Sequence, residues 1–153
     1  MTNVGESNEV SDPHDLNRFL QAQEKDYEKA LAEIKNGRKS SHWMWYIFPQ
    51  IEGIGFSLTS RQYSLKSLAE AKAYLQHPVL GLRLKDCIEV LLYIEGRSAY
   101  DIFGSPDNKK LKSCATLFAI ISPDDSVFEQ LINKYFHGMQ DENTLKLLGD
   151  NDK

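Results

Sequence analysis

The residues best suited to binding chemistry form one aromatic stretch, residues 42–50. Both tryptophans of the chain, Trp43 and Trp45, lie in this stretch, and Trp43 directly follows His42. An indole face stacks a flat ring, and imidazole or amide groups hydrogen-bond the edge of such a ring or an attached sugar. Stacking one base on an aromatic side chain contributes roughly 1–3 kcal/mol to binding. We therefore expect a pocket wall for a nucleotide-like ligand.

Burial in the core is the alternative role for the same aromatic side chains. In a helical domain an aromatic residue is more often part of the core than part of a pocket. The residues to which this reading applies are Trp43, Trp45, Tyr46 and Phe48. His42 differs from them because it stands at the expected start of a helix, where partial exposure is common. The sequence leaves both roles open.

A second group of polar residues lies over residues 101–113, where a helix is expected to start. Asp107 follows a proline, and Lys110 adds positive charge within the first turns. A helix N-terminus carries a partial positive charge and free amide groups, and Lys109, Lys110 and Lys112 add full charges, so one role of this helix start is a phosphate site. The alternative is an ordinary capped helix with solvated lysines. Arg83, in an apolar segment, either reaches solvent, pairs with another residue, or faces an anion in the pocket.

The aromatic stretch leads into residues 50–63, which contain two glycines, several hydroxyl groups and no helical period. This pattern predicts a long loop, and a loop of this length in a compact domain is more often functional than idle. We expect the loop to bring Ser57 to the ligand.

No established catalytic signature is complete in this sequence. Ser57 has the spacing of a nucleophile elbow, but the second glycine is absent. Gly53 and Gly55 match only a fragment of the dinucleotide fingerprint. The four histidines are scattered, so neither a metal site nor a cofactor is predicted. Glycosidic cleavage would require a carboxylate, for which the candidates are Glu52, Asp101 and Asp107.

Length, composition and charge limit the class of protein. A chain of 153 residues with 41% hydrophobic and 26% charged residues predicts one globular domain. The net charge of −4 argues against duplex nucleic acid as a partner, because gripping a phosphate backbone requires clustered Lys and Arg. The start of the chain lacks a secretory signal, and no run approaches the ~18 apolar residues of a membrane span. Together with two unpaired cysteines in apolar runs, these features predict a cytoplasmic protein without a membrane partner.

Helical periodicity and capping residues predict an all-α domain of about eight helices of unequal length, with no sheet. We expect tails over residues 1–12 and 150–153 around a single domain over residues 13–149. Ser40 or Ser41 is expected to cap the short aromatic helix. The segment 78–96 is apolar on most sides and predicts the central helix. The expected helices cover roughly residues 16–36, 40–48, 67–77, 78–96, 98–103, 106–121, 124–138 and 141–148.

Four sequence motifs, in order along the chain, resemble the bacterial domain-of-unknown-function family 1810. The resemblance covers residues 15–148 and implies a compact all-α fold without an established activity. Cys114 stands where such families have Met, which is a soft apolar exchange. The four motifs are HWMWYIFPQ over residues 42–50, Gly53-x-Gly55-x-Ser57, EAxAYLxHPVLGxRL over residues 70–84, and DIFGxPDxxKLxSCxTLF over residues 101–118.

A weaker resemblance links the aromatic segment and the Asp/Lys helix start to predominantly helical domains that act on ADP-ribose derivatives. It implies aromatic side chains that stack a base and a Lys110 that meets phosphate. The residues to which this resemblance points are His42, Trp43, Trp45, Gln50, Lys110 and Ser113.

The first functional hypothesis is a small-molecule binding domain for a nucleotide or ADP-ribose-like ligand, with hydrolysis of that ligand as a further step. The rival hypothesis is a non-catalytic interaction module that uses the aromatic segment as a docking groove. A structural oligomer with this segment at its interface is the third. The oligomeric state and any reaction are left open. The predicted ligand-binding residues are His42, Trp43, Trp45, Gln50, Ser57, Arg83, Asp107, Lys110 and Ser113.

Overall fold

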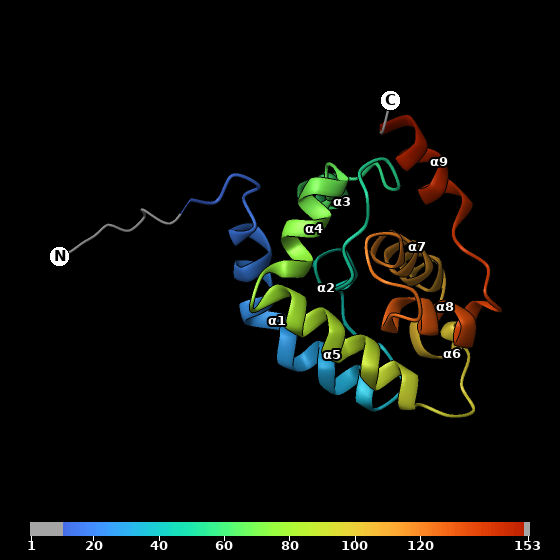
Figure 1. Ribbon diagram of the computed structural model, residues 1–153. Coiled ribbons are helices and arrows are strands. Elements are labelled where there is room, and N and C mark those ends of the chain that lie inside the picture. The colour runs from blue at the N-terminus through green and yellow to red at the C-terminus, as the bar shows by residue number, and fades with distance from the viewer. Residues whose placement is uncertain (1–10, 152–153) are drawn as a thin grey trace.

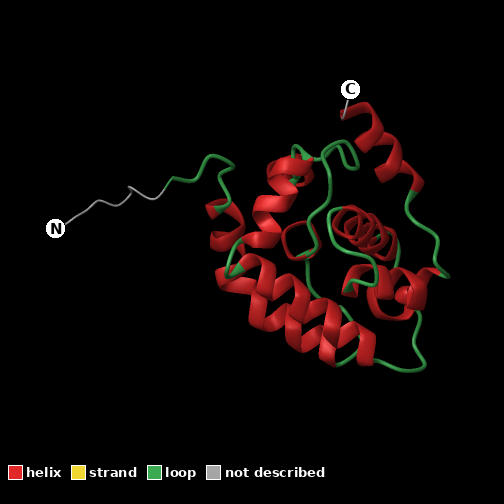
Figure 2. Cartoon of the chain, in the orientation of Figure 1, coloured by secondary structure: helices red, strands yellow, loops and turns green. Residues whose placement is uncertain are grey.

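The computed structural model describes residues 11–151, which form nine α-helices and contain no strand (Figures 1 and 2). The predicted all-α fold is confirmed for this part of the chain. The predicted tails lie mostly outside it, and α9 continues to Asn151. The helices are α1 (Asn17–Lys35), α2 (Met44–Ile47), α3 (Leu58–Tyr63), α4 (Leu68–Gln76), α5 (Leu80–Tyr93), α6 (Ala99–Phe103), α7 (Asp107–Ile120), α8 (Val127–Phe136) and α9 (Glu142–Asn151).

Helix α1 begins and ends where local chemistry favours it. The carboxylate of Asp12 accepts hydrogen bonds from the backbone amides of Leu16 and Asn17, at 2.8 and 3.0 Å. These amides have no partner within the helix, so the side chain satisfies them. At the other end Gly37 adopts a φ of +75°, and its amide donates to the carbonyl of Ile34. Glycine takes this left-handed conformation without steric cost, which turns the chain back at the end of the helix.

The central helix is α7 and not α5, so that prediction was wrong. Helix α7 packs against α4, α6, α8 and α9, and Figure 1 shows it end-on among its neighbours. The segment expected to be buried on most sides includes Val79 and Leu82, which are 38% and 59% exposed. The pattern was misleading because α7 buries two polar residues, Ser113 and Thr116, whose hydroxyls find partners inside the protein.

The predicted loop over residues 50–63 contains a further helix, α3, which the sequence analysis missed. Its N-cap is Ser57, whose hydroxyl oxygen accepts a hydrogen bond from the amide of Ser60 at 3.1 Å. A helix of six residues is too short to show a helical period. Beyond α3 the chain returns to the start of the loop, where Ile51 and Leu65 form an isolated parallel bridge.

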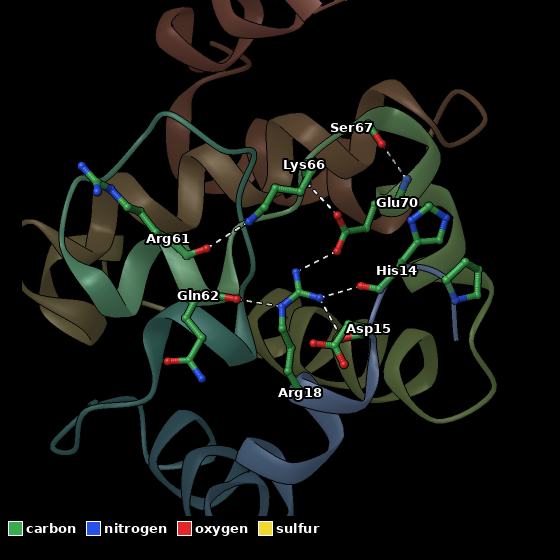
Figure 3. Close-up of a pocket in the computed structure, with 9 residues that line it drawn as sticks. His14, Asp15, Arg18, Arg61, Gln62, Lys66, Ser67 and Glu70 are labelled. Carbon is green, nitrogen blue, oxygen red and sulfur yellow. Dashed lines mark hydrogen bonds and ion pairs between the residues drawn. The ribbon is translucent and has the colours of Figure 1, made fainter. Parts of the chain in front are cut away.

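Helix α4 is held against the start of α1 by the ion pair between Arg18 and Glu70, with a separation of 2.7 Å (Figure 3). Their side chains are only 13% and 3% exposed. A guanidinium has five N–H donors, and those of Arg18 all have acceptors. The acceptors are the carbonyls of His14, Asp15, Gln62 and Ser64 and the Glu70 carboxylate.

Glu70→Ala is expected to lower the free energy of unfolding by about 3–5 kcal/mol, because it leaves a buried guanidinium without its counter-charge. Urea unfolding monitored by circular dichroism measures this loss. Glu95→Ala is the matched control, since Glu95 is 89% exposed and its ion pair with Lys134 is 3.6 Å long. The control should change stability by less than about 1 kcal/mol. Equal losses in the two variants would contradict a structural role for the buried pair.

Candidate functional site

A small cavity, which we call the aromatic cleft, lies where the aromatic stretch meets α3 and the first turn of α7. Its volume is about 140 Å³. It brings together two groups of residues that are far apart in the sequence. The predicted ligand-binding residues that line it are His42, Trp43, Trp45, Asp107 and Lys110, and the further lining residues are Lys39, Met44, Tyr46 and Thr59.

The charged part of the aromatic cleft is a carboxylate between two ammonium groups. Asp107 lies 2.8 Å from Lys39 and 3.1 Å from Lys110, and the three side chains are between 8% and 21% exposed. Burial alone would raise the pKa of Asp107, but its contacts with the two lysines outweigh burial and hold this pKa below its usual value. Asp107 is therefore ionised at neutral pH. The three groups together retain one positive charge for a ligand.

Both lysines also lie over indole rings. The ammonium nitrogen of Lys110 is 4.3 Å from the ring centre of Trp45, and that of Lys39 is 4.9 Å from Trp43. Such cation–π contacts are favourable at these distances. The two tryptophans differ in exposure, because Trp43 is only 1% exposed and Trp45 is half-buried. Trp43 thus belongs to the core, and Trp45 is the indole that a ligand can reach.

The core role of Trp43 is visible in its neighbours. Its ring packs against Phe48 and Phe103, with centroid distances of 6.1 and 6.4 Å. Phe48 and Phe103 also contact each other edge-on at 5.8 Å. This aromatic cluster joins the segment around α2 to α6, so the alternative role proposed from the sequence, burial, applies to Trp43 and Phe48.

Glu33 holds the segment that leads into the aromatic cleft, and the sequence analysis missed it. Its carboxylate accepts hydrogen bonds from the amides of Ser40 and Ser41, the Ser41 hydroxyl and the indole N–H of Trp43, at 2.6 to 3.0 Å. Ser41 therefore donates its hydrogen bonds to Glu33. The predicted cap by Ser40 or Ser41 was wrong, because the N-cap of α2 is Trp43 and no side chain caps this helix. No local signal marks Glu33, because its partners lie beyond the turn at Gly37.

The pKa of Glu33 reflects these contacts. Burial opposes ionisation and would raise it, but the hydrogen bonds from Ser41, Ser40 and Trp43 favour the charged form more strongly. They lower the pKa of Glu33 from its ordinary value of 4.5 to about 2. Four donors on one carboxylate fix the positions of the backbone and of Trp43 beside the cleft.

Three backbone amides at the start of α7 are hydrogen-bonded within the chain. The amide of Asn108 donates to the carbonyl of Gly104 at 2.8 Å. The amides of Lys109 and Lys110 donate to the carbonyl of Pro106, at 3.0 and 3.2 Å. These three amides are therefore not free to bind a ligand. The positive charge at this place comes from the side chains of Lys39 and Lys110.

Gly55 lets the loop before α3 pass close to Trp45. A Cβ atom at this position would lie 2.6 Å from Cη2 of Trp45 and 2.8 Å from the side chain of Ser60. Neither distance is compatible with a side chain, so Gly55 serves close packing on the wall of the aromatic cleft and not a dinucleotide fingerprint.

Two of the predicted ligand-binding residues have partners elsewhere in the protein. Ser57 caps α3, as described above. The hydroxyls of Ser113 and Thr144 share a hydrogen bond of 2.8 Å, and the Thr144 hydroxyl donates to Asp141. This buried chain of hydrogen bonds holds α9 on α7. Neither Ser57 nor Ser113 lines the aromatic cleft.

Arg83 and Gln50 also lie away from the aromatic cleft. The guanidinium of Arg83 lies 4.8 Å from the ring centre of Tyr27 and donates to the side-chain oxygen of Gln23 at 3.3 Å. Gln50 is 2% exposed, and its amide nitrogen donates to the carbonyl of Phe48 at 3.4 Å. Its side-chain oxygen has no hydrogen-bond partner within residues 11–151. The structure thus brings five of the nine predicted residues together.

A larger cavity of about 480 Å³ surrounds Arg18, Arg61 and Lys66 (Figure 3). Because all five donors of Arg18 have acceptors in the chain, this guanidinium has none left for an anion. The described residues contain no group of three or more His, Cys, Asp or Glu that could hold a metal ion. None of their helices is long and apolar enough to cross a membrane.

Comparison with known proteins gives a family and a structural relative. Residues 13–148 match the family described as "Protein of unknown function (DUF1810)". The solved structure of the conserved hypothetical protein Rv1873 from Mycobacterium tuberculosis is similar, with 45% sequence identity and a TM-score of 0.88. The similarity covers 90% of this chain and 99% of that chain. No curated protein matches the sequence. Neither description carries an activity.

Glu33→Gln is expected to remove a pH-dependent part of the stability. A carboxylate whose pKa is lowered on folding stabilises the folded state above its unfolded pKa, near 4.5, and loses this effect as the pH falls toward 2. The stability difference between wild type and Glu33→Gln should therefore be largest above pH 5 and shrink steadily toward pH 3. Urea unfolding over this range measures it.

The control for this measurement is Glu28→Gln on the same helix, at an exposed position. Its stability difference from wild type should stay small and flat over the same pH range. A flat difference for Glu33→Gln as well would contradict the role assigned to this carboxylate.

Proposed function

The chain belongs to the DUF1810 family, and we propose that it binds a nucleotide-like ligand in the aromatic cleft. The observation that carries this proposal is the position of Lys110, 4.3 Å from the ring centre of Trp45 and 3.1 Å from Asp107. The face of an indole ring and an ammonium group thus lie side by side in the aromatic cleft. Flat rings stack on an indole face, and phosphate groups bind an ammonium group.

The volume of the aromatic cleft limits which part of the ligand it holds. Ligand pockets usually measure roughly 300–1,000 Å³, whereas the cleft measures about 140 Å³. It accommodates a ring or a phosphate group, and the rest of the ligand lies outside it. An anion that approaches Lys110 competes with Asp107 for this lysine, and moving the ammonium toward the anion would free the face of Trp45.

Hydrolysis is a further step of the same proposal. Asp107 is the one candidate carboxylate in the lining of the cleft, because Glu52 lies outside it and Asp101 caps α6. Being ionised, Asp107 is unsuited to proton donation. It would stabilise a positively charged, oxocarbenium-like transition state once phosphate groups of the ligand balance the charges of Lys39 and Lys110. Release of free base or nicotinamide from a bound nucleotide would support this step.

The rival proposal, a protein-docking module, also has an observation in its favour. Phe56 precedes α3 and Leu58 is its first residue, next to Thr59 of the cleft; the two side chains are 78% and 84% exposed. Exposed apolar side chains of this size suit a docking peptide. Substituting both by Ser should leave nucleotide binding unchanged if the cleft is a ligand site, and should abolish capture of a protein partner if this surface is a docking groove.

Nucleotide binding should raise the melting temperature, because a ligand that binds only the folded protein stabilises it. We expect this shift with ADP-ribose, NAD or AMP at about 1 mM, together with quenching of tryptophan fluorescence. Lys110→Met should weaken binding roughly tenfold or more, since a hydrogen bond to a charged group contributes about 1.5–3 kcal/mol. Isothermal titration calorimetry measures the ratio.

Lys109→Met is the matched control, because Lys109 is the exposed neighbour and does not line the cleft. It should change the affinity less than twofold. Absence of any shift with this nucleotide panel, or equal weakening by the two substitutions, would overturn the proposed function.

A further inference from the structure

A second cavity, which we call the arginine pocket, shares Lys39 with the aromatic cleft. Its volume is about 360 Å³, and it lies between the end of α1 and helix α6. Arg38 and Arg97 line it together with Lys39. Neither arginine stands out in the sequence, because they come from segments that meet only in the folded protein.

The charge in the arginine pocket is positive. Arg38 and Arg97 line it with a single carboxylate, that of Asp101, and the third cationic residue, Lys39, is paired with Asp107 in the cleft. This carboxylate already accepts a hydrogen bond from the amide of Ser98 at 2.9 Å, in the capping box of α6. Backbone and side-chain hydrogen bonds of Ser98 hold the pKa of Asp101 below its usual value. Asp101 therefore neutralises at most one of the two arginine charges.

The guanidinium of Arg97 is fixed by backbone carbonyls. Its Nε donates to Gly37 at 2.8 Å, and one terminal nitrogen donates to Asp101 at 3.2 Å. Glycine at position 37 allows Arg97 to approach this closely, because a Cβ atom there would lie 3.0 Å from Cδ of Arg97. The other terminal nitrogen of Arg97 has no acceptor within residues 11–151, and the side chain of Arg38 has none there either. Unlike Arg18, both arginines keep donors for a ligand.

We propose that the arginine pocket binds a second anionic group of the ligand, so that the chain prefers nucleoside diphosphates and their esters to monophosphates. This inference rests on the proposed function of the aromatic cleft. One phosphate would lie at Lys110 and the next at Arg38 and Arg97, with Lys39 between them. Guanidinium groups bind phosphate with paired hydrogen bonds, which a lysine does not provide.

The two cavities differ in size. The arginine pocket, with about 360 Å³, lies within the roughly 300–1,000 Å³ of ligand pockets, whereas the cleft, with about 140 Å³, does not. The ammonium group of Lys39 faces Asp107 in the cleft, and its backbone amide donates to Ile102 beside the pocket at 2.7 Å. Lys39 thus belongs to the wall that both cavities share.

The experiment compares AMP with ADP, which differ by one phosphate, by calorimetry at a single ionic strength because exposed charges are screened by salt. Wild type should bind ADP at least tenfold more tightly than AMP. Arg38→Gln should reduce ADP affinity to that of AMP and leave AMP unchanged. Arg97→Lys, which keeps the charge but loses the paired hydrogen bonds, should act in the same direction. Lys35→Gln, an equal change of charge at an exposed position near the end of α1, should have no effect.

Two outcomes separate this inference from the proposed function. One outcome is that AMP binds in a Lys110-dependent way but ADP binds no more tightly, or that Arg38→Gln weakens the binding of AMP and ADP equally. This outcome would overturn the second anion site and leave the proposed function of the aromatic cleft intact. If no nucleotide binds, the preference for diphosphates is overturned with the proposed function. A titration with pyrophosphate, followed by amide NMR shifts near Gly37 and Arg97, then tests the anion site itself. Shifts that Arg38→Gln abolishes would support that site, and their absence would overturn it.

Discussion

The ion pair between Lys39 and Asp107 is the interaction on which the candidate site depends. It joins the segment after α1 to the first turn of α7, and both side chains are largely buried. A buried charge is costly unless it is paired, so each of the two residues requires the other. Lys110 adds a second positive charge to the same carboxylate. The aromatic cleft and the arginine pocket meet at Lys39, so this one contact sets the position of both.

The aromatic stretch serves the core and the surface at once. Trp43 packs with Phe48 and Phe103, whereas Trp45 turns toward Lys110. Trp45 belongs to α2, whereas Trp43 is the N-cap residue before it and has a non-helical φ of −143°. The two side chains therefore leave the backbone in different directions, one toward the core and one toward the cleft. The two roles that the sequence leaves open are both filled, each by its own tryptophan.

The arginines of this chain illustrate how structural and ligand-binding charges differ. Arg18 has an acceptor for each of its five donors and an ionised partner at 2.7 Å. Arg97 donates hydrogen bonds to two backbone carbonyls, and its other terminal nitrogen has no partner among the described residues. A guanidinium with all donors satisfied stabilises the fold, whereas one with unused donors at a cavity retains the capacity to bind an anion.

The sequence alone determined the all-α class, the ends of most helices and the aromatic stretch, because caps, turns and periodicity act over a few residues. The Ser98 capping box and the turn at Gly37 were predictable for this reason. The tertiary structure alone decided that Trp45 reaches the cleft, that Glu33 holds its wall, and that Lys39 lies against Asp107. Those contacts join residues from separate turns and helices, and their energy comes from burial and charge pairing that exist only once the chain has folded.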